Sequence, residues 1–234
     1  MDYEASLEAF YRQLPLEAGT VIDVGAHVGR HAIPLANQVG CKGIVHAFEP
    51  IPYIRNLLLQ NLELAKLNNV ILYPIALTNK PATVQFHYIP NLAGQSGIKA
   101  RHSYDQAPSE TQLIDLFARP LDDLLAGIDV DFIKIDIEGG ELDMLQGAVS
   151  ILERARPIVS FECGAAAFLG YHDRPQEIFN LFDQRGYAVH SILGDLMPDE
   201  ESFAMASYAQ SFWDYVAFPL EKVDLARLLE TKAD

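Results

Sequence analysis

The segment from Val21 to Gly29 most constrains the fold of this chain. A short β-branched, apolar run ends at Gly25, and a stretch with helical spacing begins at Val28. A strand that turns on glycine into a helix is typical of the first unit of a nucleotide-binding α/β domain. We expect Gly25 to let the backbone pass close to a ligand, and Gly29 to let the helix pack closely on the strand.

The spacing of these glycines argues against a dinucleotide site. The turn reads G-x-x-x-G, whereas a dinucleotide fingerprint needs G-x-G-x-x-G to seat a diphosphate on the helix. Ala26 and His27 occupy the turn, and Asp23 precedes it near the end of the strand. With Asp23 expected to face the crevice, the site suits a cationic ligand better than a diphosphate.

The rest of the chain alternates between short apolar runs and segments with helical spacing. Strands are predicted over 20–24, 43–48, 70–75, 84–88, 131–137, 158–163, 188–193 and 212–218. Helices are predicted over 5–14, 28–39, 51–67, 121–125, 141–154 and 176–185. This alternation predicts an α/β fold with a mostly parallel sheet and helices on both faces. The run 84–88 falls outside the alternation and is expected to form an extra strand.

Two segments, 90–113 and 194–211, have no regular pattern. Loops of this length are either functional lids or surface loops, and the sequence leaves both open. We expect a helical extension over 1–19 followed by a single compact domain over 20–234.

The charge of the chain limits the classes of partner that we expect it to bind. A net charge of −15 and a pI near 4.7 would repel phosphate backbones and anionic lipid headgroups, so nucleic acid and membranes are not expected as partners. We expect neither a secretory leader nor a membrane helix, because residues 1–16 lack a basic start and an apolar core and no apolar stretch approaches the roughly 18 residues that a membrane helix needs. A cytoplasmic protein acting on a small molecule is expected, and its oligomeric state stays open.

Further acids lie at predicted strand ends. Glu49 ends the second strand, where a carboxylate accepts hydrogen bonds from ribose hydroxyls in nucleotide-binding folds. In the run from Phe132 to Gly140, Lys134, Asp136 and Glu138 share one face.

Asp136 lies where ligands bind in open α/β sheets, so we expect it at the reacting centre. Glu162 on the next strand is the expected partner of Lys134. A purely structural ion pair between these two residues, with Glu138 capping the next helix, is an equally weighted alternative.

Together these segments resemble the FkbM family of S-adenosylmethionine-dependent methyltransferases. The resemblance rests on 21–29, Ala47-Phe-Glu-Pro50, Pro74-Ile-Ala-Leu-Thr78, Lys134-Ile-Asp-Ile-Glu-Gly139, 141–147 and Phe161-Glu162. It implies a class I Rossmann-like fold whose seven-stranded sheet ends in an antiparallel strand, and O-methylation of sugars or polyketide-type natural products.

The resemblance also implies roles for single residues. Asp23, Gly25 and Gly29 would lie beside the methionyl part of the cofactor, Glu49 at its ribose, and Asp136 near the sulfonium. The family commonly has asparagine at the position of His27. An acid that binds adenine in many class I enzymes is replaced here by the segment 76–77, so adenine recognition is unassigned.

An alcohol is a poor nucleophile, so a base or a metal should help remove its proton. The candidate bases are His27, Asp136 and Glu138. A Mg²⁺ site built from Asp136, Glu138 and Glu162 is a further hypothesis, because hard cations prefer oxygen ligands. The alternatives for the whole protein are a nicotinamide-dependent oxidoreductase and a non-catalytic adenosylmethionine-binding module.

Overall fold

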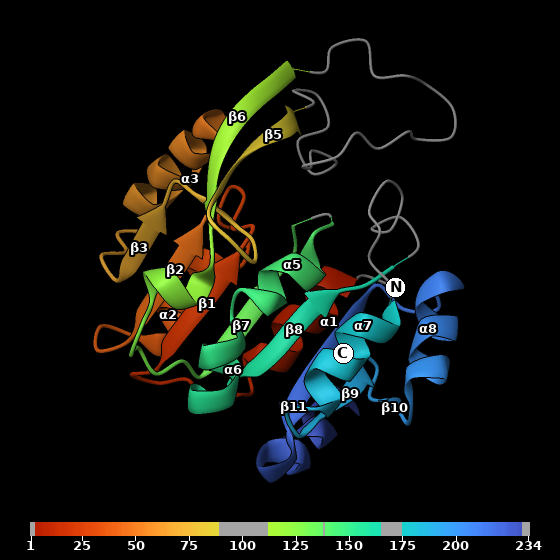
Figure 1. Cartoon of the computed structure of the whole chain (residues 1–234). Helices are drawn as coiled ribbons and strands as arrows, with labels where there is room; N and C mark the ends of the chain where they lie inside the picture. Colours follow the sequence, from red (N-terminus) through yellow and green to blue (C-terminus); the bar gives the residue numbers. More distant parts are fainter. Residues whose placement is uncertain (1–2, 89–111, 138, 165–174, 231–234) are drawn as a thin grey trace.

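A computed structural model of the chain describes residues 3–88, 112–137, 139–164 and 175–230. Its main sheet has the strand order β10-β9-β11-β8-β7-β1-β2-β3 (Figure 1). The strands are β1 (Thr20–Val24), β2 (Ile44–Phe48), β3 (Val70–Tyr73), β7 (Phe132–Ile135), β8 (Ile158–Glu162), β9 (Tyr187–Ser191), β10 (Leu196–Met197) and β11 (Asp214–Pro219).

The predicted mostly parallel sheet is confirmed. β3, β2, β1, β7 and β8 pair in parallel in that order, whereas β11 runs antiparallel to both β8 and β9. The family resemblance implied seven strands, but the main sheet has eight, because the two-residue β10 adds to the edge strand β9.

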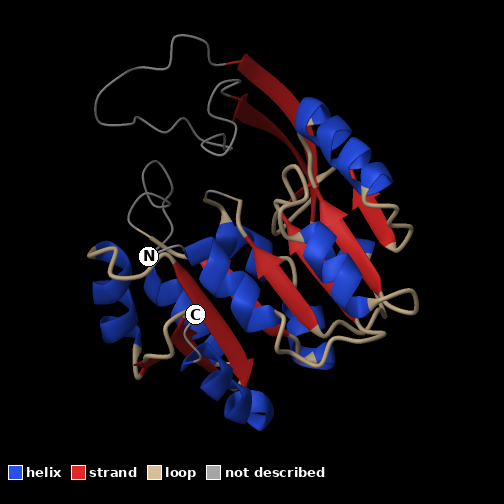
Figure 2. Ribbon diagram, turned by 180° about the vertical axis from the view of Figure 1, so that it is seen from behind, coloured by secondary structure: helices blue, strands red, loops and turns tan. Residues whose placement is uncertain are grey.

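Helices cover both faces of the sheet, as predicted (Figures 1 and 2). Val21 packs with α1 (Tyr3–Tyr11) and α2 (Ala32–Val39), while Ala47 packs with α3 (Pro52–Leu64). Ile22 and Val24, which point the other way, pack with the helices that follow β6. Those helices are α4 (Leu121–Leu124), α5 (Glu141–Gln146), α6 (Val149–Ala155), α7 (Pro175–Asp183) and α8 (Glu200–Tyr208), and η2 (Leu220–Glu230) follows β11.

The N-terminal helix α1 belongs to the core of the domain. Leu7, Phe10 and Tyr11 are buried in the cluster that contains Val21. The rings of Phe10 and Phe218 meet edge to face, with centroids 5.8 Å apart. The helix α1 of the expected extension therefore packs on the sheet.

A second, three-stranded sheet has the order β4-β6-β5. It consists of β4 (Ala76–Leu77), β5 (Ala82–Tyr88) and β6 (Gln112–Arg119). β5 confirms the expected extra strand. The sequence did not predict β6, because this strand begins inside the segment 90–113 that has no regular pattern. Most of that segment lies outside the described residues.

Two other predictions are wrong. The segment 194–211 contains β10 and α8, and Asp199 caps α8 by accepting a hydrogen bond from the Ser202 amide at 2.8 Å. The predicted helix 141–154 is broken in two at Gly147. A side chain there would come within 2.2 Å of the Thr78 carbonyl oxygen, so the backbone passes close to the second sheet.

No helix within the described ranges is long and apolar enough to cross a bilayer.

Candidate functional site

The turn after β1 is folded onto the end of β2. The amides of Gly25 and Ala26 both donate to the Phe48 carbonyl at 3.0 Å, and the His27 amide donates to Glu49 Oε2 at 3.0 Å. His27 has a φ of +49°, a left-handed conformation that asparagine and histidine adopt more often than most residues. Histidine can therefore replace the asparagine that is common in the family without a change of backbone.

A side chain at either glycine of the turn would collide with a neighbouring segment. Gly25 has a φ of +78°, and a Cβ there would lie 1.8 Å from the Asp136 carbonyl oxygen. A Cβ on Gly29 would lie 2.7 Å from Leu58 Cδ1 in α3. Gly25 thus lets the backbone pass close to the segment that follows β7, and Gly29 lies against α3. The expected approach of a ligand to Gly25 stays a prediction.

Glu49 fastens this turn. Its carboxylate is 4% exposed, with Oε1 accepting from the Ile51 amide at 2.8 Å and Oε2 from the His27 amide. Burial is the main cause that raises the pKa of Glu49 to about 7. Each carboxylate oxygen can accept a second hydrogen bond, so contact with ribose hydroxyls is compatible with these bonds and stays a prediction.

The sequence predicted that Asp23 faces an open crevice, but in the structure its side chain is buried. It is 0% exposed and shares its strand face with Val21, which packs under α1 and α2. Neither carboxylate oxygen has a hydrogen-bond partner among the described residues, and Lys134 Nζ lies 3.7 Å from Oδ1. Burial raises the pKa of Asp23, while the Lys134 cation opposes that shift.

Lys134 joins Asp23 to Asp136. Its Nζ donates to Asp136 Oδ2 at 3.0 Å, and the side chain of Lys134 is 4% exposed whereas that of Asp136 is 31% exposed. The expected partner, Glu162, lies at the end of β8 opposite Asp214 in the register of β11. The carboxylates at the ammonium group are therefore on β1 and just beyond β7, and Glu138 lies outside the described residues.

His27 presents a buried imidazole nitrogen to the site. Its Nε2 has no hydrogen-bond partner in the part of the chain that the structure describes. Burial, as the largest cause, lowers the pKa of His27. The lowered pKa favours the neutral ring, in which one nitrogen can accept a hydrogen bond.

The structure brings in residues that the sequence analysis missed. Glu4 of α1 contacts His31 Nε2 at 2.5 Å and accepts from Arg30 Nε at 3.0 Å. Tyr11 lies 3.2 Å from the other ring nitrogen of His31. No sequence motif predicts these contacts, because they form only where α1 packs across the start of α2.

Asp214 is the second missed acid. It is the first residue of β11, and burial, together with the neighbouring Asp136, raises its pKa to about 7. An antiparallel last strand begins at the edge where the parallel strands end. That rule places Asp214 at the same edge as Asp136 and was the signal available in the sequence.

The Mg²⁺ hypothesis gains no support. In the described ranges, no group of three or more histidine, cysteine, aspartate and glutamate side chains is arranged to hold a metal ion. One of the three proposed ligands, Glu138, is not described.

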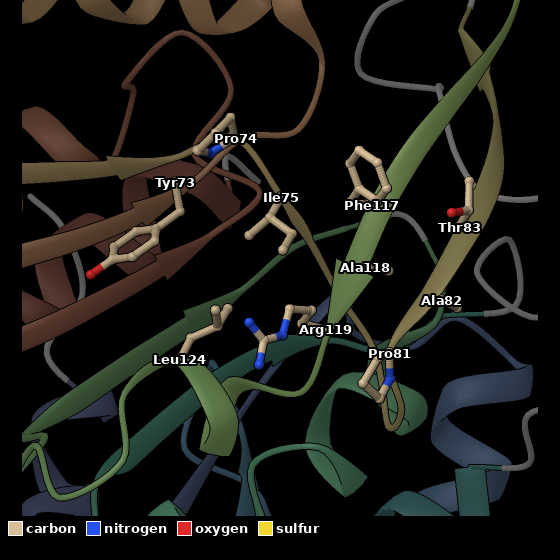
Figure 3. Close-up of a pocket in the computed structure, with 10 residues that line it drawn as sticks. All are labelled: Tyr73, Pro74, Ile75, Pro81, Ala82, Thr83, Phe117, Ala118, Arg119 and Leu124. Carbon is tan, nitrogen blue, oxygen red and sulfur yellow. The ribbon is translucent and has the colours of Figure 1, made fainter.

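A cavity of about 650 Å³ lies beside the second sheet (Figure 3). Its wall is mostly apolar and includes Ile75, Phe117 and Leu124, with Arg119 as its charged side chain. It neighbours the Glu49 turn, because the Glu49 amide donates to the carbonyl of Tyr73, another wall residue, at 3.1 Å. Among the described residues, neither Asp23 nor Asp136 lines this cavity, so it is separate from the site that these two acids form.

The sheet with its antiparallel β11, the glycine turn after β1 and the acids at the carboxyl edge define a class I methyltransferase fold. A solved methyltransferase FkbM from Methylobacillus flagellatus superposes with a TM-score of 0.52 at 19% identity, over 88% of this chain and 45% of that one. The model of the methyltransferase FkbM domain matches residues 23–189. The chain belongs to the FkbM methyltransferase domain family.

Two fungal relatives are similar in sequence. Methyltransferase 1 of Beauveria bassiana is 24% identical, with 54% of this chain and 57% of that protein aligned. Methyltransferase sdnD of Sordaria araneosa is 25% identical, with 54% and 59% aligned. The chain thus spans less than two thirds of the length of these relatives.

Proposed function

We propose that the protein is an S-adenosylmethionine-dependent methyltransferase that acts on a hydroxyl group of a small molecule of the sugar or natural-product type. Membership of the FkbM family is the observation that carries the proposal. The buried carboxylates beside the glycine turn support it, because they provide the charge that a sulfonium cofactor requires.

The residues at the turn fit this cofactor. The cluster has two carboxyl groups, of Asp23 and Asp136, against the one ammonium group of Lys134, and Asp23 has both oxygens free of hydrogen bonds among the described residues. Asp23 would lie at the methionyl end, Gly25 to Gly29 along it, and Glu49 at the ribose. When bound, the cofactor supplies an electrophilic methyl group on sulfur.

The acceptor hydroxyl needs orientation and a proton acceptor. Asp136 is the acid of this set that is partly open to solvent, with 31% of its side chain exposed, so it can contact an acceptor. His27, with a neutral ring and an unpaired Nε2, is the second candidate base. Positioning alone can supply about 7–11 kcal/mol of the barrier, so the base need only assist.

The partners follow from charge. The net charge of −15 disfavours phosphate-rich acceptors, so we propose a neutral or cationic small molecule rather than nucleic acid or a lipid surface.

Calorimetry with S-adenosylhomocysteine and NAD in parallel tests the cofactor class. We expect the nucleoside thioether to bind and NAD not to bind. Binding of NAD alone would replace this proposal with the nicotinamide-dependent oxidoreductase.

Incubation of a lysate with methyl-labelled cofactor, followed by mass spectrometry, tests turnover. We expect a product that carries the labelled methyl group on oxygen. Cofactor binding without any labelled product would indicate a non-catalytic module.

Two variants test where the cofactor lies. Asp23→Asn and Glu49→Gln each replace a carboxyl group by an amide of nearly the same volume, and each should weaken cofactor binding at least about tenfold. Glu63→Gln, on the exposed side of α3, is the matched control and should bind normally. Normal affinity in both site variants, with unchanged melting curves, would show that the cofactor binds elsewhere.

A further inference from the structure

Lys134 is a buried cation to which the proposed function assigns no task. It lies within β7, is 3% exposed, and pairs with Asp136 and Asp23 at 3.0 and 3.7 Å. A buried ammonium group costs several kcal/mol unless it is paired, so this position demands acidic partners. The two partners are the residues that the proposed function places at the methionyl end and at the reacting centre.

The register of the sheet shows how these groups are aligned. Asp23 is paired with Lys134 across β1 and β7, and Lys134 is paired with Ser160 across β7 and β8. The three side chains therefore form a row on one face, which α1 and α2 cover at Val21. The Ser160 hydroxyl is fully buried and has no hydrogen-bond partner among the described residues.

We propose that Lys134 is a positioning residue of the cofactor site, whose ammonium group holds the carboxyl groups of Asp23 and Asp136 together. The inference rests on the proposed function, since it assumes that a cationic cofactor binds beside these carboxylates. The Lys134 cation then fixes the positions of both Asp23, which is buried under the turn, and Asp136, which is partly exposed next to the acceptor.

The charges around Asp23 indicate what removal of the cation would do. Burial favours the protonated acid, and Lys134 is the strongest of the groups that oppose it. The other charged or titratable groups coupled to Asp23 or to Lys134 are Glu4 and Tyr11 of α1, His31 before α2, His27 in the turn, Glu49 after β2, Asp136 beyond β7 and Asp214 of β11. Without Lys134, Asp23 should take up a proton, which a cationic cofactor must displace when it binds.

Calorimetry of the full chain measures that proton. S-adenosylmethionine is titrated into the wild type and into Lys134→Met at pH 7, in two buffers with different ionisation enthalpies. We expect Lys134→Met to bind at least about tenfold more weakly and to release close to one proton more than the wild type. Lys134→Arg keeps the charge and should release no more protons than the wild type.

The Asp23→Asn background is the matched control. There the buried carboxylate is absent, so adding Lys134→Met should release no extra proton and should lower the affinity less than about threefold. This comparison also serves if Lys134→Met alone does not fold, because the neutral background needs no buried counter-charge.

Three results would overturn the role of Lys134. They are wild-type affinity and proton release in folded Lys134→Met, extra proton release in Lys134→Arg, and a further tenfold loss in the Asp23→Asn background. Failure of the wild type to bind the cofactor at all would instead refute the proposed function.

Discussion

Single residues shape the candidate site through the backbone as much as through their side chains. The turn after β1 uses a glycine where any side chain would collide with the Asp136 carbonyl, and a histidine in a left-handed conformation two residues later. Glu49 then fixes the turn by accepting from the His27 amide. The position of the acids thus depends on backbone contacts that substitution of the acids alone would not reveal.

Replacing Gly25 by alanine tests this view. The new Cβ would be placed 1.8 Å from a backbone oxygen at a φ of +78°, so the strand ends must separate. We expect a loss of more than about 4 kcal/mol in the free energy of unfolding, measured by urea denaturation. Gly127→Ala is the control, because Gly127 has a φ of +79° with nothing within 4 Å, and it should cost about 1–2 kcal/mol. Equal losses in both variants would contradict the close approach.

Among the elements, α1 connects the N-terminus of the chain to the site. Its apolar side packs on the sheet, while Glu4 at its start contacts His31 and Arg30 beside α2. The hydrogen bond from His31 is the main reason that the pKa of Glu4 falls to about 2. The polar contact therefore orients the start of a helix that the apolar core already holds.

The contact of Glu4 predicts a defined acid dependence. Because its folded pKa lies below the usual 4.5, its stabilisation is present above pH 4.5 and is lost as the pH falls toward 2. The Glu4 side chain is 46% exposed, so solvent screening limits the effect to about 1 kcal/mol. Glu4→Gln should lower the free energy of unfolding by that amount at pH 6 and flatten its decline between pH 4.5 and 2.

Glu8→Gln in the same helix is the comparison for this measurement. Glu8 forms an i,i+4 pair with Arg12 on the exposed side of α1, and such pairs contribute about 0.3–0.5 kcal/mol. A pH profile of Glu4→Gln that matches that of Glu8→Gln would show that the contact with His31 contributes nothing special.

The whole molecule carries a net charge of −15, and the candidate site adds a local negative charge at its carboxyl edge. A negative field attracts a sulfonium cofactor but not its neutral thioether product. The overall charge and the local acids therefore act in the same direction on cofactor binding.

This field predicts a difference in salt dependence. Raising the ionic strength shortens the distance over which charges interact, so it should weaken the binding of S-adenosylmethionine more than that of S-adenosylhomocysteine. Calorimetry at low and high sodium chloride gives the ratio of the two affinities. Equal salt dependence for both compounds would mean that the protein field does not contribute to the choice between them.

The sequence by itself determined the family, the mostly parallel α/β sheet and the places where acids end its strands. These follow from patterns within short segments, such as the glycine turn after β1 and the alternation of apolar runs with helices. Two predictions failed because the deciding signal was not a pattern of apolar residues. The helix α8 was not predicted, because it begins at a capping aspartate. The helix predicted over 141–154 is broken, because α5 ends where Gly147 meets the second sheet.

Only the tertiary structure decided how the site residues are used. Asp23 is buried, and the Glu49 carboxylate accepts a hydrogen bond from the turn. Lys134 donates to Asp136, whereas the sequence predicted Glu162 as its partner. The contacts of Glu4 and Asp214 depend on how α1 and β11 pack. The reason is that such contacts join residues far apart in the chain, and strand register and helix packing, which no short segment encodes, set their distances.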